Sequence, residues 1–193
     1  MENIIFATNN LNKVLEVKSI IGDKFGILSL SEAGIDIDIP EPYDTIEENA
    51  IEKARVINEL TKENCFSEDT GLEVEALNGE PGVKSARYSG NEKDPEANIN
   101  KVLDKLKDHE NRRAQFKTVI CLIINGKQNI FDGICKGAII AQRKGQSGFG
   151  YDPVFVPDGS DKTFGEMNME EKNIFSHRKK AVEKLTRFLN SFE

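Results

Sequence analysis

The order of strand-like and helix-like patterns constrains the fold of this 193-residue chain more than any other feature. The short apolar run at 3–8 predicts a buried strand. A polar turn, "NNLN", separates it from 13–21, where apolar residues recur at the spacing of a helix. A second helix is predicted over 45–62, because Thr45 and Glu48 form a capping-box pattern ahead of a one-sided apolar stripe. Strands and helices therefore alternate from the start of the chain.

Later segments continue this alternation. The stretch 34–40 alternates apolar and acidic residues and is interpreted as a strand or an extended edge, whereas 79–90 is rich in Gly, Pro and Ser and is expected to be loop. A helix is predicted over 95–108, and strands over 114–125, 128–135 and 137–143. The pair Asn125-Gly126 marks a hairpin between the first two of these strands. A short strand within 148–159 and helices over 169–174 and 177–192 complete the prediction.

Composition limits the function classes. The length fits one domain over residues 1–193, with room for two lobes, and 38% hydrophobic and 31% charged residues are typical of a globular protein. The net charge of -7 argues against a general nucleic-acid binder, which needs a basic surface. No apolar run approaches the roughly 20 residues of a membrane span, and the first residues do not resemble a signal peptide. We therefore expect neither nucleic acid nor membrane as a partner.

The three cysteines indicate the compartment. Cys65, Cys121 and Cys135 lie in apolar surroundings, and none of them is part of a CxxC motif. Their scatter favours reduced thiols in the core over a disulfide or a metal site. The expected localisation is cytoplasmic.

The stretch "EDTGLEVE" at 68–75 places four carboxylates in a segment that otherwise reads as strand. The apolar residues at 72, 74 and 76 alternate with Glu73 and Glu75, so these two acids are expected on the solvated face. Glu68 and Asp69 precede Gly71, where we expect a bend. Adjacent acids there could ligate Mg²⁺, which prefers oxygen, or could simply face water.

Three further clusters carry candidate chemistry. The loop "TNNLNK" (8–13) precedes a helix whose N-terminal amides and Lys13 suit a phosphate, although an ordinary polar turn would look the same. In "SGFGYDP" (147–153), Gly and aromatic residues beside Asp152 could hold a flat ligand or pack in the core. In "EEKNIFSHRKK" (170–180), Lys172 and the pair His177 and Arg178 are either ligand-binding or solvated.

Together, the order and spacing of these clusters resemble the inosine triphosphate pyrophosphatase family, the non-standard purine NTP pyrophosphatases also called XTP/dITP diphosphatases. The resemblance covers nearly the whole chain. "FATNNLNK" is similar to the family's T-x-N-x-x-K loop, and "EDTGLEVEALNGEPGVKSARYSG" to its acidic segment. "GFGYDP" and "EKNIFSHR" match its FG[YW]D and EK-x-x-x-SHR signatures. One departure is Asn9, where the family commonly has Gly.

The resemblance implies a role for each matching residue. Asp69 would be the general base and, with Glu41, would bind Mg²⁺, or Mn²⁺ in its place. The substrate would be bound by residues from all four clusters and the second helix: Thr8, Asn9, Asn10, Lys13, Lys53, Thr70, Phe149, Gly150, Tyr151, Asp152, Lys172, His177 and Arg178. The reaction it implies is hydrolysis of ITP, dITP and XTP to the monophosphate and pyrophosphate, which keeps deaminated purines out of DNA and RNA.

The same resemblance implies an α/β fold: an elongated, two-lobed molecule with a long twisted mixed β-sheet, flanking helices and a central substrate cleft, assembled as a homodimer. Two rival functions share part of the pattern. The septum-inhibitor type of nucleotide pyrophosphatase shares the fold, but the "SHR" and "FGYD" signatures argue against it. A regulatory nucleotide-binding module that has lost catalysis would be expected to lack Lys13 or Asp69, and both are present.

Overall fold

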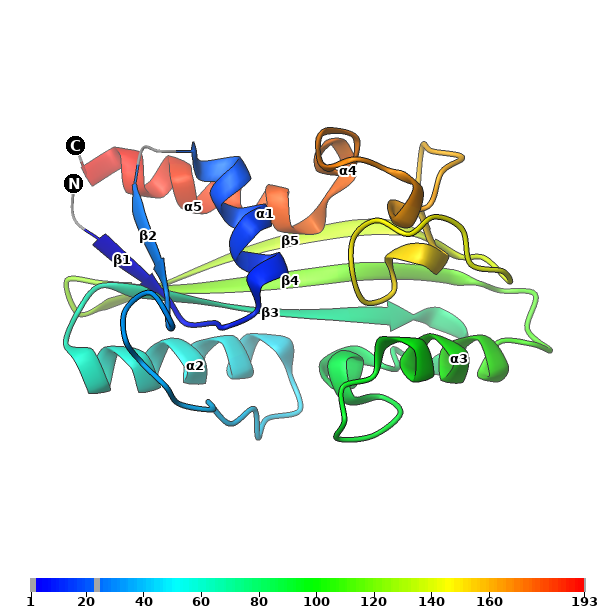
Figure 1. The fold of residues 1–193 in the computed structure, drawn as a ribbon, viewed down its shortest axis with the longest axis horizontal. Coiled ribbons are helices and arrows are strands. Elements are labelled where there is room, and N and C mark those ends of the chain that lie inside the picture. The colour runs from blue at the N-terminus through cyan, green and yellow to red at the C-terminus, as the bar shows by residue number, and fades with distance from the viewer. Residues whose placement is uncertain (1–2, 23–24, 193) are drawn as a thin grey trace. The chain divides into compact units, whose positions relative to one another are not determined.

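The computed structural model describes residues 3–22 and 25–192. Its strands are β1 (Asn3–Phe6), β2 (Gly26–Ser29), β3 (Cys65–Val74), β4 (Arg113–Ile124), β5 (Lys127–Ile139) and β6 (Phe155–Pro157). Its α-helices are α1 (Leu11–Ile21), α2 (Ile46–Thr61), α3 (Pro95–Lys105), α4 (Met169–Phe175) and α5 (His177–Leu189). Short 3₁₀ turns include those at Gly82–Arg87, Asp152–Val154 and Phe164–Glu166. The predicted mixture of helices and strands is confirmed (Figure 1).

The strands form a mixed sheet in the order β2-β1-β3-β4-β5-β6. β1 pairs in parallel with β2 and with β3, whereas β5 and β6 pair antiparallel. Between β4 and β5 the chain turns at Asn125 and Gly126, both with positive φ (51° and 71°). Positive φ at both central residues is typical of a type I′ hairpin, so the predicted turn is confirmed.

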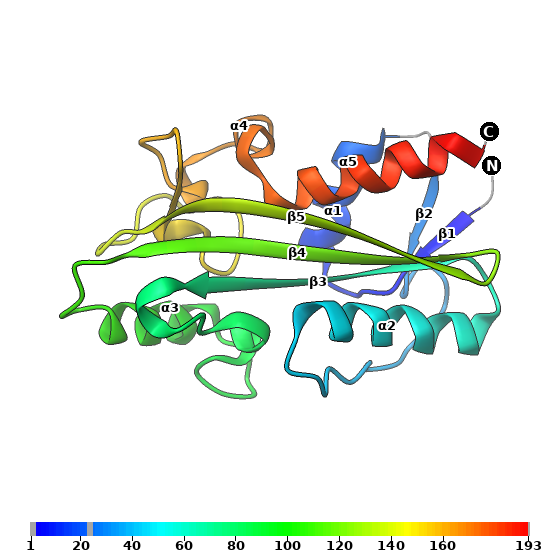
Figure 2. The same cartoon turned by 180° about the vertical axis from the view of Figure 1, so that it is seen from behind.

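The chain divides into two compact units, and each has a core of its own. Unit 1 comprises residues 1–69, 118–133 and 178–193. In this unit α2 lies on one face of the strands, and α1 and α5 lie on the other (Figures 1 and 2). Val17 of α1 and Leu185 of α5 are fully buried in its core beside Phe6 and Phe66, whose rings stack with centroids 4.4 Å apart.

Unit 2 comprises residues 70–117 and 134–177. Its core joins Val102 of α3, which lies on one face of the strand segments, to the aromatic residues Phe116, Phe155 and Phe164. The ring of Phe116 meets that of Phe155 edge-on, with centroids 4.7 Å apart. Arg112 anchors the entry to β4, because its guanidinium donates to the backbone oxygens of residues 106, 139 and 140.

Four details differ from the sequence prediction, beginning with β5. This single strand continues where two strands were predicted. Gly137, the first residue of the second predicted strand, is where β6 approaches, since a Cβ there would lie 2.2 Å from the backbone oxygen of Val156. β2 was not predicted, because a strand of only four residues, from Gly26 to Ser29, carries too little pattern.

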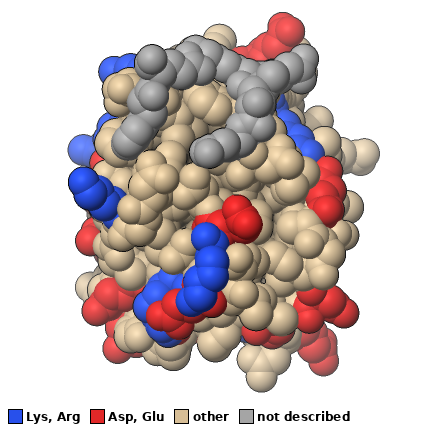
Figure 3. Space-filling view, turned by 90° about the vertical axis from the view of Figure 1, so that its left-hand side faces the viewer, with Lys and Arg blue, Asp and Glu red and all other residues tan. Residues whose placement is uncertain are grey.

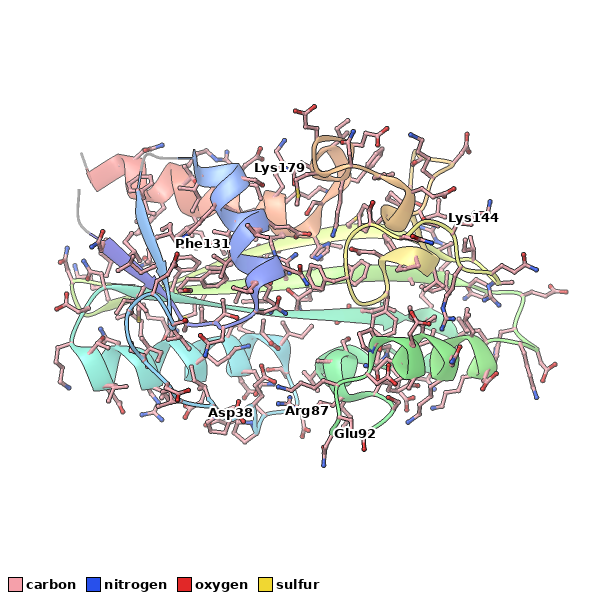
Figure 4. All side chains as sticks on the ribbon, in the orientation of Figure 1. Asp38, Arg87, Glu92, Phe131, Lys144 and Lys179 are labelled. Atoms are coloured by element: carbon pink, nitrogen blue, oxygen red, sulfur yellow. The ribbon has the colours of Figure 1, made fainter. Side chains whose placement is uncertain are left out.

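The two other differences concern the acidic segments. β3 runs straight through the position of the expected bend at Glu68 and Asp69. In the stretch 34–40, which includes Asp38 (Figure 4), Gly34 ends a turn and residues 35–40 belong to no strand or helix. Its isoleucines are nevertheless half-buried and alternate with exposed acids. The alternation therefore indicates correctly which side chains face the protein, although the segment is not part of the sheet.

The cysteines, two acids of β3 and its end, and the charged surface can be compared with the sequence expectations. The three cysteines are buried free thiols, and burial raises the pKa of both Cys65 and Cys121 to about 12. Glu75 is exposed as expected, while Glu73 is half-buried and accepts from Gln115 at 2.6 Å. Among the described residues, no helix is long and apolar enough to cross a membrane. On the face shown in Figure 3, acidic and basic side chains lie beside one another without a patch of one sign.

Candidate active site

The two faces of β3 separate the adjacent acids Glu68 and Asp69. Side chains of consecutive strand residues point to opposite faces. Asp69 Oδ1 accepts a hydrogen bond from Lys53 Nζ of α2 at 2.7 Å. Glu68 instead accepts from Arg178, at the start of α5, with Nε and Nη2 each 2.7 Å from a carboxylate oxygen. The two acids therefore have different partners on different faces of unit 1 and do not act as one paired ligand.

Asp69 belongs to a carboxylate–ammonium–carboxylate arrangement. Lys53 Nζ also donates to Glu41 Oε1 at 2.8 Å, so one ammonium bridges both acids. The side chains of Lys53 and Asp69 are 7% and 10% exposed. Burial raises the pKa of Asp69, and the nearby charges of Lys53 and Lys13 offset this only in part. Burial alone would lower the pKa of Lys53, but Asp69 and Glu41 hold it above its ordinary value.

The loop that carries Glu41 is held by an asparagine of α2. Asn49 is 1% exposed. Its Oδ1 accepts from the backbone N–H of Tyr43 at 3.0 Å, and its Nδ2 donates to the backbone oxygen of Tyr43 at 2.9 Å. Thr45 caps the same helix by accepting from the backbone N–H of Glu48 at 3.1 Å. The residues just after Glu41 are thus attached at two points to the helix that carries Lys53.

On the other face of β3, Glu68 takes part in a buried charge cluster. Arg178 is 1% exposed and donates through Nη1 to Glu16 of α1 in addition to Glu68. Burial would lower the pKa of Arg178, but Glu68 and Glu16 raise it above its ordinary value. Lys13 Nζ lies 3.4 Å from Glu68 Oε1, and burial lowers the pKa of Lys13. Two acids thus balance two basic groups here.

The loop before α1 is organised by its own side chains. Asn10 is the N-cap, and its Oδ1 accepts from the backbone N–H groups of Asn12 and Lys13 at 3.1 and 3.3 Å. Since that oxygen is committed to the helix, Asn10 can offer a ligand only its N–H₂ group. Thr8 Oγ1 accepts from the N–H of Asn10 at 3.1 Å. Asn9 Oδ1 accepts from the backbone N–H at position 31 at 3.0 Å. The backbone of Asn9 does not have a positive φ, so its conformation does not require the glycine that the family commonly has there.

Unit 2 contains a second buried ion pair. Lys172 Nζ of α4 donates to Asp152 Oδ2 at 2.7 Å, and the side chains are 5% and 4% exposed. The same oxygen accepts from the backbone N–H of Phe149 at 2.9 Å. The Lys172 ammonium lies 5.1 Å from the Phe149 ring centroid, a cation–π distance. Gly148 has φ of 77°, and a Cβ on it would lie 2.1 Å from Asp152 Oδ2, so only glycine fits at this turn.

The remaining expected residues of unit 2 are placed as follows. Tyr151 is 4% exposed, packs in the core, and donates through its hydroxyl to the backbone oxygen of Ser85 at 2.8 Å. His177 is 3% exposed and stacks on Phe116 with centroids 4.7 Å apart. Gly150 and Thr70 are half-buried, and Thr70 directly follows Asp69 in β3. Their contact with a substrate stays a prediction.

This arrangement can be compared with known proteins. The model of the Ham1 family matches residues 4–188. The chain belongs to the Ham1 family. Relatives named dITP/XTP pyrophosphatase include one from Flavobacterium psychrophilum, 50% identical over 97% of this chain and 99% of its own length. Another, from Bacillus subtilis, is 40% identical over 99% of this chain and 98% of its own length.

Solved structures support the same assignment. The Ham1 protein of Staphylococcus aureus has a TM-score of 0.90 at 39% identity, with 100% of both chains covered. The protein from Mycobacterium abscessus titled nucleoside-triphosphatase / dITP/XTP pyrophosphatase has a TM-score of 0.77 at 38% identity, covering 95% of this chain and 98% of its own. The α/β fold with a mixed sheet, which the sequence resemblance implied, is confirmed.

The carboxylates of Glu41 and Asp69 have the chemistry that a Mg²⁺ ion prefers in its ligands. Both direct a carboxylate oxygen at one shared position, which the Lys53 ammonium occupies. Within residues 3–22 and 25–192, no group of three or more His, Cys, Asp or Glu side chains could hold a metal ion by itself. Two carboxylates fit Mg²⁺, which is commonly bound by one or two protein carboxylates together with substrate phosphates and water.

Two residues of this region were missed in the sequence analysis. Glu16 lies on the helical face that also carries Val17, and one acid in an amphipathic helix reads as solvated. Asn49 is buried in α2, where "ENAIEKA" gave no sign of a loop contact. A polar residue beside the apolar stripe of a helix can be suspected of being buried, and Asn49 lies next to Ala50 of the apolar stripe of α2. Its partner, the Tyr43 backbone, could not be identified.

Proposed function

We propose that this chain hydrolyses the non-standard purine nucleoside triphosphates ITP, dITP and XTP to the monophosphate and pyrophosphate. The observation that carries the proposal is the arrangement in which the buried ammonium of Lys53 bridges the carboxylates of Asp69 and Glu41, in a member of the Ham1 family. Relatives over nearly the whole chain are named dITP/XTP pyrophosphatase. The proposed localisation is cytoplasmic, where such nucleotides arise, and the proposed assembly is a homodimer.

In the proposed reaction, Asp69 accepts a proton from the attacking water. Its pKa is raised by burial, and a general base works best when its pKa lies nearer the working pH than that of an ordinary aspartate. Asp69 and Glu41 would hold Mg²⁺, which would neutralise charge on the triphosphate and align it for attack. Mn²⁺ would serve in its place. The metal requirement is part of the proposal.

The phosphate chain would be held by basic groups and by the start of α1. Lys13 is in the first turn of that helix, whose N-terminal amide groups carry partial positive charge. The N–H₂ group of Asn10 and the hydroxyl of Thr8 lie on the same loop. Charge stabilisation of this kind is usually the largest contribution to phosphoryl-transfer catalysis.

Base choice is proposed to depend on the buried pair in unit 2. Lys172 can only donate hydrogen bonds and Asp152, when ionised, can only accept them. Hypoxanthine and xanthine carry an acceptor at O6 beside a donor at N1, whereas adenine carries a donor at C6 beside an acceptor at N1. The keto purines therefore match the pair, and adenine would meet unmatched groups at both positions. A polar site can reject such an analogue by about 10⁴-fold.

Arg178 was expected beside these residues. The contacts of its guanidinium are to Glu16 and Glu68 in unit 1, so its donation to a base stays a prediction. None of the contacts described here favours the rival function, that of a nucleotide pyrophosphatase of the septum-inhibitor type. A regulatory role without catalysis would not require a buried aspartate whose pKa is raised, as it is for Asp69.

The test is a product analysis with purified protein and Mg²⁺. ITP, dITP and XTP should yield IMP, dIMP and XMP with pyrophosphate, at far higher kcat/KM than ATP or dTTP, and EDTA should abolish turnover. Release of orthophosphate and a diphosphate would contradict cleavage at the α-phosphorus. Equal hydrolysis of ATP and ITP would contradict the base assignment, and sedimentation of the same sample tests the dimer.

A further inference from the structure

The Lys53 ammonium lies where a divalent cation would need to lie. It contacts Glu41 Oε1 at 2.8 Å and Asp69 Oδ1 at 2.7 Å, so it bridges the two acids proposed to hold Mg²⁺. Its side chain is 7% exposed, which leaves it little solvent to compete with those bonds. Both contacts have the length of a charge-assisted hydrogen bond from an ammonium to a carboxylate.

This bridge has an electrostatic reason. Two carboxylates that face one position, Asp69 buried and Glu41 with a side chain 26% exposed, repel each other unless a cation lies between them. Glu41 is held near Asp69 by the loop that Asn49 attaches to α2, which limits how far the two acids can move apart. An ammonium supplied by the same helix neutralises them and keeps their oxygens directed at one point. The same ammonium repels any second cation that approaches that point.

We propose that Lys53 acts as a built-in counter-ion, which fills the cation position between Glu41 and Asp69 until a divalent ion and nucleotide arrive together. Lys53 must leave this position for the ion to be bound. Its ammonium then needs a new anionic partner, and the triphosphate of the substrate is the group that would supply one. This inference rests on the proposed function, because it assumes that Glu41 and Asp69 are the metal ligands.

The consequence is a coupling between ion and substrate. In the free protein, displacement of Lys53 would leave a buried ammonium without a counter-ion, which is strongly unfavourable. A bound nucleotide removes that penalty. Lys53 therefore lowers the affinity of the free protein for a divalent ion and raises it for the ion accompanied by a polyphosphate. It is a positioning residue for the metal as well as a binding residue for phosphate.

The experiment measures Mn²⁺ binding directly, by electron paramagnetic resonance of free Mn²⁺ at fixed pH and without nucleotide. Lys53→Met, which keeps the volume and removes the charge, should bind Mn²⁺ about tenfold or more tightly than the unaltered protein. The same variant should show a raised KM for ITP. Lys13→Met is the matched control, because Lys13 is a half-buried lysine that contacts Glu68 instead. It should change Mn²⁺ affinity far less.

Unchanged or weaker Mn²⁺ binding by Lys53→Met would overturn the inference, as would an equal effect of Lys13→Met, which would indicate general charge alone. Failure of the proposed metal site gives a different result. If Glu41→Gln in the Lys53→Met background leaves Mn²⁺ affinity unchanged, Glu41 is not a ligand and the site assignment itself is wrong. Should Lys53→Met fail to fold by circular dichroism, Lys53→Gln keeps a donor for Asp69 without the charge, and the same outcomes apply.

Discussion

At the scale of single residues, we expect the proposed activity to depend on the ionised carboxylate of Asp69. Asp69→Asn removes the proposed base and one proposed metal ligand, while it preserves shape and a hydrogen-bond acceptor for Lys53. We expect kcat for ITP to fall by about 10² or more, because loss of a general base alone has an effect of this size. The far-ultraviolet circular dichroism should be unchanged.

The matched control for Asp69→Asn is Glu75→Gln, an exposed acid just beyond the end of the same strand. It should retain full activity in the same assay of pyrophosphate release. If Asp69→Asn kept more than half of the original kcat, Asp69 could not be the base.

A second residue-scale prediction concerns Gly148. With φ of 77° and no room for a Cβ beside Asp152 Oδ2, Gly148→Ala should displace that carboxylate from Lys172. We expect the ratio of kcat/KM for ITP to that for ATP to fall at least tenfold. Gly79→Ala has similar backbone strain, since φ is 87°, but nothing lies within 4 Å of its Cβ. An equal fall of the ratio in Gly79→Ala would mean that strain, and not the position of Asp152, is responsible.

At the scale of elements, the short strand β2 depends on what holds its end. Glu32 accepts from Lys18 of α1 at 2.8 Å and from the backbone N–H of Ser29 at 2.7 Å. These hydrogen bonds lower the pKa of Glu32 from 4.5 to about 2, and the bond from Lys18 contributes more than those from Ser29. Because the folded protein has the lower pKa, the stabilisation is present above pH 4.5 and is lost as the pH falls towards 2.

Glu32→Gln should therefore lower the melting temperature at pH 7 by about 2 °C, a modest effect because the pair is partly exposed. The difference from the unaltered protein should shrink when both are measured at pH 3. Glu92→Gln, at an exposed acid labelled in Figure 4, is the control and should change neither value. A difference that stayed constant with pH would show that the ionised form of Glu32 does not stabilise β2.

At the scale of the whole molecule, the two units have separate cores, yet β3, β4 and β5 each contribute residues to both. A strand that is continuous through two cores is expected to couple their unfolding, in agreement with the sequence prediction of one domain. Leu72→Ala in unit 2 and Leu185→Ala in unit 1 both remove a fully buried side chain. Each should destabilise the protein by about 2–5 kcal/mol.

Differential scanning calorimetry should show one transition in the unaltered protein and in both variants, at similarly lowered temperatures. The expected calorimetric and van't Hoff enthalpies are equal. Two separated transitions, with only one of them moved by each substitution, would show that the units unfold independently and that the chain is not one domain.

Patterns that depend on near neighbours were determined by the sequence alone. The positions of α2 and α3, the hairpin at Asn125-Gly126 and the apolar face of β3 follow from caps, turn residues and periodicity within about ten residues. The motif spacings also indicated the family. In contrast, β2 was missed and β5 was divided, because a four-residue strand has no periodicity of its own and the role of Gly137 depends on β6.

Only the tertiary structure decided which charge meets which. Glu68 and Asp69 are neighbours with the same chemistry, and their sequence does not distinguish them. The pleat of β3 sends one towards Arg178 and the other towards Lys53. Those partners come from helices 110 and 16 residues away. Their arrival depends on the packing of α5 and α2 on opposite faces of the sheet, and the burial that packing produces is what raises the pKa of Asp69.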